Sequence, residues 1–150
     1  MTFIGIDPGS KGGIAIIDGD NIMAFPYSDE KYREIFEMYQ GTNCLCFIEK
    51  VHSMPKQGVS STFTFGMNYG KILGMLIGFR IPFEQITPQK WKKKFALIGA
   101  DKNASIQKCK ELYPNVSLLA TERSRKENDG MAEALLIATA AKRYYMGAIV

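Results

Sequence analysis

The chain has almost none of the residues from which zinc sites and disulfide frameworks are built. Of its 150 residues, one is histidine and three are cysteine, so a zinc site of the cysteine/histidine type lacks ligands. An odd number of cysteines also does not form a disulfide framework. Cys44 and Cys46 alternate with Leu45 and Phe47 in an apolar run. We therefore predict that these cysteines are buried core residues.

Long hydrophobic runs are missing as well. The apolar stretch Ile72–Phe79 is far shorter than the roughly 20 residues that a membrane-spanning helix needs. Charges at Asp7, Lys11 and Asp18 interrupt the N-terminal region, so no signal-peptide core is readable. With 46% hydrophobic and 23% charged residues, the composition is that of an ordinary globular protein. We expect a soluble cytoplasmic protein with one domain over residues 1–150.

Positive charge is unevenly distributed along the chain. The formal net charge is +4, but the window from Lys90 to Lys126 is rich in lysine and arginine and poor in acids. Such a block is either a solvated face or a surface for a polyanion, because clustered basic side chains gain affinity for nucleic acid by releasing counterions. The candidate contact residues are Lys90, Lys92, Lys93, Lys94, Lys102, Arg123, Arg125 and Lys126.

Hydrophobic periodicity predicts an α/β protein with a mixed sheet. Apolar runs that end in turn residues predict strands at Thr2–Ile6, Gly12–Ile17, Ile22–Phe25, Cys44–Ile48 and Phe83–Ile86. Helical spacing and capping residues predict helices at Asp29–Tyr39, Thr62–Gly78, Thr87–Phe95, Lys102–Tyr113 and Asp129–Met146. A turn at Asp18–Asn21 makes the first three strands an antiparallel meander. We also expect a short extended segment at Val116–Leu119.

One expected helix contains an unusual number of glycines. Gly66, Gly70, Gly74 and Gly78 recur at every fourth position, and each costs roughly 1 kcal/mol relative to alanine in a helix interior. Close approach of another helix or backbone is the simplest compensation. That partner lies in the same chain or in a second copy.

Two acidic residues directly follow apolar strands. Asp7 follows Thr2–Ile6, and Glu49 follows Cys44–Ile48. A charged carboxylate at such a place is costly unless it is solvated, paired or metal-bound, and ligands of open α/β sheets bind at the carboxyl ends of strands. If the two strands are parallel neighbours, both side chains reach one place. Otherwise the two acids simply begin loops.

A second pair of acids lies at the start of the last helix. Asp129 and Glu133 are four residues apart and therefore share one helical face, where like charges repel. Acids at a helix start also complement the helix dipole, which suffices for Asp129 but less well for Glu133, inside an apolar segment. A divalent cation would resolve the repulsion. Oxygen ligands without histidine or cysteine indicate Mg²⁺ or Mn²⁺.

Several of these residues lie in motifs that occur together in one family. The motifs are I-G-I-D-P-G at Ile4–Gly9, G-G-I-A at Gly12–Ala15, F-I-E-K-V at Phe47–Val51, G-A-D-K at Gly99–Lys102 and D-G-M-A-E-A-L-L-I-A at Asp129–Ala138. In this order they resemble the RuvC family of Holliday-junction resolvases, in particular its bacteriophage members. The likeness extends over nearly the whole chain. The first motif alone is also typical of sugar-kinase-like and actin-like ATPases.

The resemblance implies a ribonuclease-H-like fold, with a five-stranded mixed sheet of three antiparallel and two parallel strands flanked by helices. It implies a homodimer that makes paired incisions in four-way DNA junctions with two Mg²⁺ ions per site, Mn²⁺ substituting. The metal ligands carried over are Asp7, Glu49, Asp129 and Glu133. Lys102 matches a basic residue near the scissile phosphate. A phage-encoded protein of this kind acts in the bacterial host cytoplasm.

The chain departs from the bacterial pattern in three ways. Bacterial members usually carry aspartate where Glu133 stands, with an acid or histidine three residues earlier; that position is Gly130 here, and the acid is Asp129. His52 stands where many bacterial members have an aromatic residue that helps to open the junction. We expect the Gly66–Gly78 helix to make the dimer contact and Trp91 to be packed inward.

Three other functions are compatible with parts of the sequence. A nucleotide-binding, kinase-like module would use Asp7 and the Gly12-Gly13 turn at phosphates, but it normally needs a second lobe. A catalytically inactive DNA-binding protein conflicts with the intact set of four acids. A broader debranching nuclease that acts on flaps, forks and Y-junctions is the main alternative to a strict junction resolvase.

Overall fold

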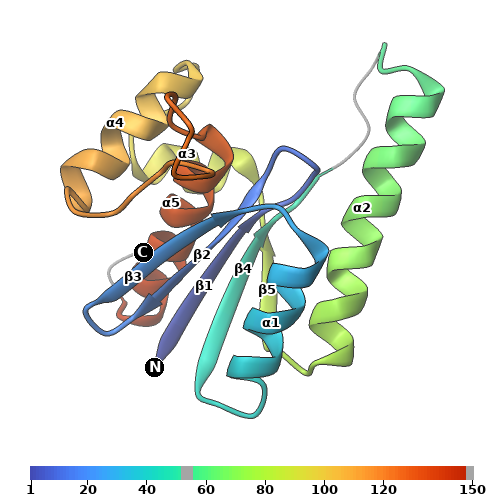
Figure 1. Ribbon diagram of the computed structural model, residues 1–150, viewed down its shortest axis with the longest axis horizontal. Coiled ribbons are helices and arrows are strands. Elements are labelled where there is room, and N and C mark those ends of the chain that lie inside the picture. Colours follow the sequence, from blue (N-terminus) through green and yellow to red (C-terminus); the bar gives the residue numbers. More distant parts are fainter. Residues whose placement is uncertain (52–55, 148–150) are drawn as a thin grey trace.

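The computed structural model of the protein describes residues 1–51 and 56–147, and its centre is a five-stranded sheet with strand order β3-β2-β1-β4-β5 (Figure 1). The strands are β1 (Thr2–Asp7), β2 (Gly13–Asp18), β3 (Asn21–Pro26), β4 (Cys44–Glu49) and β5 (Phe83–Ile86). β1, β2 and β3 form the antiparallel meander, whereas β4 is parallel to β1 and β5 is parallel to β4. The predicted fold class is therefore confirmed.

Helices cover both faces of the sheet (Figure 1). They are α1 (Asp29–Tyr39), α2 (Val59–Gly78), α3 (Pro88–Lys94), α4 (Lys102–Leu112) and α5 (Asp129–Tyr145). α1 and α2 pack on one face, and α3, α4 and α5 on the other. In the part of the chain that the structure describes, we find no helix that could cross a membrane.

Alternation along the strands divides the core between the two faces. Ile4 and Ile6 of β1 point into the core beneath α1 and α2, whereas Phe3 points toward α5. α5 lies over β1 and β2 and is buried almost all round from Gly130 to Ala141, which explains why its sequence is apolar on nearly every face. Cys44, Cys46 and Cys109 are free and buried, which confirms the structural role predicted for them.

Glycine at position 5 allows α5 to lie directly on β1. A Cβ atom at Gly5 would stand 2.1 Å from the backbone oxygen of Ala134 and 2.2 Å from the backbone nitrogen of Ala138. Both atoms belong to the rigid backbone of α5, so no side-chain rotation relieves the overlap. The absence of a side chain at this position therefore sets how close the last helix comes to the central strand.

α2 begins at Val59 rather than at the predicted Thr62. Two partners were left open for its glycines, one in the same chain and one in a second copy. A Cβ atom at Gly66, Gly70, Gly74 or Gly78 would meet no heavy atom of the described residues within 4 Å. The reason is that α2 packs inward through the buried side chains of Ile72 and Leu76, and the glycines lie elsewhere on the helix. Of the two alternatives, a close contact with the described residues of the same chain is therefore excluded.

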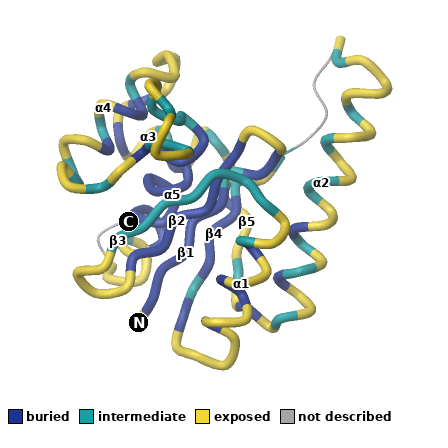
Figure 2. The backbone as a smooth tube through the Cα atoms, viewed as in Figure 1, coloured by how far each residue is buried: buried dark blue, intermediate teal, exposed yellow. Residues whose placement is uncertain are grey.

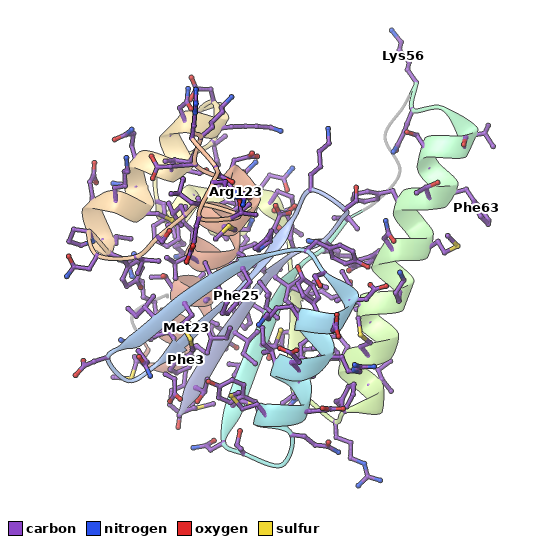
Figure 3. The ribbon with its side chains drawn as sticks, viewed as in Figure 1. Phe3, Met23, Phe25, Lys56, Phe63 and Arg123 are labelled. Atoms are coloured by element: carbon purple, nitrogen blue, oxygen red, sulfur yellow. The ribbon has the colours of Figure 1, made fainter. Side chains whose placement is uncertain are left out.

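The side of α2 that faces solvent is apolar. Val59, Phe63, Met67 and Ile77 are exposed by 88%, 69%, 56% and 66% respectively, and Phe63 projects from the helix away from the sheet (Figure 3). Much of the helix is drawn as exposed in Figure 2. We call the stripe formed by these side chains and the exposed glycines between them the outer face of α2.

Val116–Leu119, where we expected a short extended segment, forms no strand of the sheet. The backbone N–H of Asn128 donates to the carbonyl of Leu118 at 2.7 Å, and the Leu118 side chain is buried. This hydrogen bond joins the segment to the residues that precede α5. Apolar residues at this point of the sequence pack against the core without pairing as a strand.

Candidate metal and nucleic-acid site

Parallel pairing of β1 with β4 brings the first two predicted acids together. The register pairs Ile6 with Ile48, so Asp7 and Glu49 follow at the carboxyl ends of neighbouring strands. Alternation places both side chains on the face that α5 covers, together with Phe3 and Phe47. The expectation that parallel neighbours would bring these acids to one place is thus met by the sheet topology.

The start of α5 brings the other two acids to the same place. Asn128 caps the helix by accepting a hydrogen bond from the backbone N–H of Met131 at 2.9 Å. Asp129 and Glu133 follow on one helical face. All four carboxylates line one open hollow of about 380 Å³. The other lining residues are Pro8, Gly9, Ser10, Lys11, Gly12, Val51, Phe65 and Lys102.

The start of α5 is sterically restricted at residue 130. A Cβ atom at Gly130 would stand 2.3 Å from the backbone oxygen of Lys11 and 2.8 Å from the Cα atom of Gly12. α5 therefore begins in direct contact with the turn between β1 and β2. No side chain fits at residue 130, and the preceding residue, Asp129, lines the hollow.

The crowding of acids shifts their proton affinities. Burial raises the pKa of Asp7 well above its ordinary value, and the nearby charges of Glu133, Glu49 and Asp129 raise it further. Burial also raises the pKa of Glu133, followed by the charge of Glu49, while the charge of Lys92 opposes this rise. A side-chain hydrogen bond between Asp7 and Glu133 raises the pKa of Asp7 and lowers that of Glu133.

The other two acids have partners outside the carboxylate set. Glu49 Oε2 accepts a hydrogen bond from the indole Nε1 of Trp91 at 2.7 Å, and Asp129 pairs with Lys102 at 3.5 Å. Burial raises the pKa of Glu49, whereas the Trp91 hydrogen bond and the charge of Lys92 lower it. Every carboxylate of the hollow therefore has a protein partner.

The donor set fits a hard divalent cation. Four carboxylates without histidine or cysteine are the ligands that Mg²⁺ and Mn²⁺ prefer, and a cation among them would remove the repulsion that raises the pKa of Asp7. Among the described residues, no group of three or more histidine, cysteine, aspartate or glutamate side chains is arranged to hold a metal ion as it stands. Binding therefore requires the carboxylates to exchange some present partners, which a soft terminal torsion permits.

The predicted basic residues fall into two groups. Lys102 lines the hollow, and Lys92 is close enough for its charge to act on Glu49 and Glu133. Lys90, Lys93 and Lys94 lie on the exposed surface of α3, and Arg123, Arg125 and Lys126 are exposed on the segment between α4 and α5 (Figure 3 labels Arg123). None of this second group is among the described residues that line the hollow.

Sequence reasoning missed several contributors to this region. Trp91 was expected to be buried, and it is, but its hydrogen bond to Glu49 was not foreseen. Ser10 and Phe65 line both the carboxylate hollow and an adjoining hollow of about 540 Å³. Hydroxyl and amide groups of α2 complete that second hollow: Ser60, Ser61, Thr64 and Asn68. His52 lies outside the described residues.

Comparison with known proteins places this arrangement in a known fold. No family model matches the chain, and no curated protein sequence matches it. Solved structures do match. Thermus thermophilus RuvC is 20% identical with a TM-score of 0.58, over 98% of this chain and 97% of that one. T. thermophilus RuvC in complex with a Holliday junction substrate is 17% identical with a TM-score of 0.61, over 98% and 96%.

The yeast mitochondrial Holliday junction resolvase is 15% identical with a TM-score of 0.56, over 95% of this chain and 78% of that one. These likenesses extend over nearly the whole chain. The protein therefore has the fold of RuvC, as the sequence motifs implied.

Proposed function

We propose that the protein is a metal-dependent endodeoxyribonuclease that cuts four-way DNA junctions. The observation that carries the proposal is the convergence of Asp7, Glu49, Asp129 and Glu133 around one hollow at the carboxyl edge of a sheet with the RuvC fold. Three separate elements supply these acids. The burial of Asp7 among other carboxylates is energetically unfavourable unless a bound cation compensates their charge. The fold alone does not determine an activity, so the carboxylate set is the primary support.

We propose Mg²⁺ as the cofactor, with Mn²⁺ as a substitute and two ions per site. The ligands are Asp7, Glu49, Asp129 and Glu133. Of these residues, Asp7 interacts with all three other acids. Such ions activate water and stabilise the leaving oxygen of phosphodiester hydrolysis. The protein contributes the charge and the placement of its carboxylates.

Basic residues around the hollow are suited to hold the DNA backbone. Lys102 lines the hollow beside Asp129, and we assign it to the charge that develops on the phosphate. Contacts farther from the hollow are assigned to the exposed lysines of α3 and to the basic residues before α5. Phosphate contacts of this kind position DNA without reading its sequence.

The assay that tests the function offers labelled four-way junctions, flaps, forks, Y-junctions and linear duplex to the purified protein. We expect symmetric paired nicks in the four-way junction with Mg²⁺ or Mn²⁺ and no cleavage in EDTA, because the carboxylates alone supply no nucleophile. Cleavage that persists in EDTA contradicts the proposal. Equal cleavage of flaps, forks and Y-junctions would instead establish a broader debranching nuclease.

We further propose that two copies pair through the outer face of α2. Exposed apolar side chains in a contiguous stripe mark interaction surfaces, and Phe63 and Met67 lie beside glycines that permit close approach of a second helix. A two-fold dimer presents two identical sites to a substrate of near two-fold symmetry. This arrangement fits paired incision.

The dimer is tested by adding charge to the outer face of α2. We expect the wild-type chain to sediment as a dimer and the double variant Phe63→Glu, Met67→Glu to sediment as a monomer, because burying two carboxylates at an apolar contact is unfavourable. Met38→Glu is the matched control, since Met38 is a helical methionine exposed by 67% on α1, and it should remain dimeric. A double variant that sediments like this control excludes α2 as the contact.

A further inference from the structure

Trp91 is the only tryptophan of the chain, and its side chain is 0% exposed. It lies in α3, a short helix whose other residues are polar apart from Pro88. A buried indole N–H requires an acceptor. The acceptor is Glu49 Oε2, at 2.7 Å. A buried residue of α3 thus donates a hydrogen bond to a carboxylate of the candidate metal site.

The surroundings of Trp91 hold its indole ring in place. Thr87 caps α3 by accepting a hydrogen bond from the backbone N–H of Lys90 at 3.3 Å. The ring belongs to the buried cluster that includes Phe95 and Leu97. The ammonium group of Lys92 lies 5.5 Å from the ring centroid. A donor fixed in this way by packing defines one position for the oxygen that it binds.

Among the residues that the structure describes, Glu49 is the one acid of the hollow with a hydrogen-bond donor on a fully buried side chain. Asp129 pairs with the mostly exposed Lys102, and Asp7 and Glu133 bond to each other. A carboxylate without a fixed donor rotates easily about its terminal bond. The Trp91 N–H occupies Oε2 and orients the carboxylate plane of Glu49, leaving Oε1 free of this donor.

We infer that Trp91 is a positioning residue for metal binding, whose indole N–H orients the Glu49 carboxylate for a divalent cation. The inference rests on the proposed metal site. Partners of this kind typically change metal affinity or activity by 10- to 100-fold when they are removed. Trp91 acts through Glu49 and needs no contact with the DNA or the reacting atoms.

The sharpest test removes only the N–H. Because the chain has one tryptophan, growth on the benzothiophene analogue of tryptophan replaces Trp91 alone and exchanges its N–H for sulfur at nearly the same shape. Calorimetric titration of the metal-free protein with Mg²⁺ and with Mn²⁺ should show binding weakened by about 10-fold or more. The unfolding temperature in EDTA should stay close to that of the unmodified protein. Metal affinity within twofold of the unmodified protein overturns the inference.

A second test separates positioning from core packing. Trp91→Phe should raise the Mg²⁺ concentration for half-maximal junction cleavage by about 10-fold or more, with a near-normal rate at saturating Mg²⁺. Phe95→Leu is the matched control, because it loosens the same cluster without removing a donor, and its half-maximal Mg²⁺ concentration should not change. An equal shift in both variants, or a lost rate that Mg²⁺ fails to restore in Trp91→Phe, assigns Trp91 to packing alone.

A double-mutant cycle supplies the last control. In a Glu49→Gln background, Trp91→Phe should weaken calorimetric metal binding no further, because the two residues act as one unit. Independent, additive losses overturn the inference. The calorimetric results do not depend on DNA cleavage. Metal binding that requires Trp91 in a protein that cuts no branched DNA would refute the proposed function while the inference stands.

Discussion

Asp7→Asn is expected to lower junction cleavage by about a thousandfold or more. Asp7 interacts with all three other acids of the hollow, so its loss affects every proposed ligand position. Metal ions contribute several kcal/mol to the stabilisation of a hydrolytic transition state, and each 1.36 kcal/mol is a factor of ten in rate. The measurement is a single-turnover rate on a labelled four-way junction at saturating Mg²⁺. Asp20→Asn, an exposed acid in the turn between β2 and β3, is the control and should cut normally.

Although Asp7→Asn should lower cleavage, it should raise the free energy of unfolding when no metal is present. The pKa of Asp7 is raised by burial and by its acidic neighbours, so the folded state binds the proton more tightly than the unfolded state. The free energy of unfolding then falls as pH rises from the unfolded pKa, about 3.9, through the raised pKa of the folded state. The destabilisation therefore grows as the pH rises from the unfolded pKa toward neutral, and Asp7→Asn removes it.

We therefore expect Asp7→Asn to unfold at a higher temperature than the wild type in EDTA at neutral pH. The difference between the two unfolding temperatures should shrink as the pH is lowered, because protonation of Asp7 removes the repulsion among the acids of the wild type as well. Added Mg²⁺ should stabilise the wild type more than the variant, since a ligand stabilises only the state that binds it. A less stable Asp7→Asn protein in EDTA at neutral pH, or cleavage within tenfold of the wild type, contradicts the assigned role.

Gly5→Ala is expected to cause a large loss of stability. The new Cβ would overlap two backbone atoms of α5, at 2.1 and 2.2 Å, so β1 and α5 must separate. Overpacking of this kind costs typically 1–3 kcal/mol and occasionally more, and we expect about 3 kcal/mol or above. That loss corresponds to roughly 6–12 °C in the unfolding temperature of a chain of this size.

Gly74→Ala is the matched control for this prediction. A Cβ atom at Gly74 meets no described heavy atom within 4 Å, and alanine gains roughly 1 kcal/mol over glycine in a helix interior. Gly74→Ala should therefore stabilise the chain at low protein concentration, where α2 is unpaired. Chemical denaturation of both variants provides the comparison. A Gly5→Ala protein as stable as the wild type would mean that α5 does not pack on β1 at this distance.

The acids illustrate how much of the site the sequence can predict. Asp7 and Glu49 each end an apolar strand, and Asp129 and Glu133 share a helical face, so local patterns were sufficient to nominate all four. Their convergence required the parallel register of β1 with β4 and the packing of α5 on β1. These contacts join residues far apart in the chain, and no local pattern encodes them.

Trp91 and the glycines of α2 show where local patterns are insufficient. A single tryptophan among lysines indicated burial, but its acceptor, Glu49, lies 42 residues earlier in the chain. Regular spacing of Gly66 to Gly78 indicated a close neighbour, yet the described part of the chain supplies none within 4 Å. The sequence pattern indicated that Trp91 needs a hydrogen-bond acceptor and that the glycines need a close neighbour. Only the tertiary structure showed that the first is present in this chain and that the second is not found among the described residues.

The sequence by itself determined the element types, the fold class and the four candidate acids, because side-chain periodicity and strand-end charges are properties of neighbouring residues. The tertiary structure alone decided the partners: Glu49 with Trp91, Asp129 with Lys102, and Gly130 against the backbone of Lys11. It also excluded a side chain at residue 130. Steric fit and hydrogen bonding between distant segments depend on interatomic distances that only the packed chain defines.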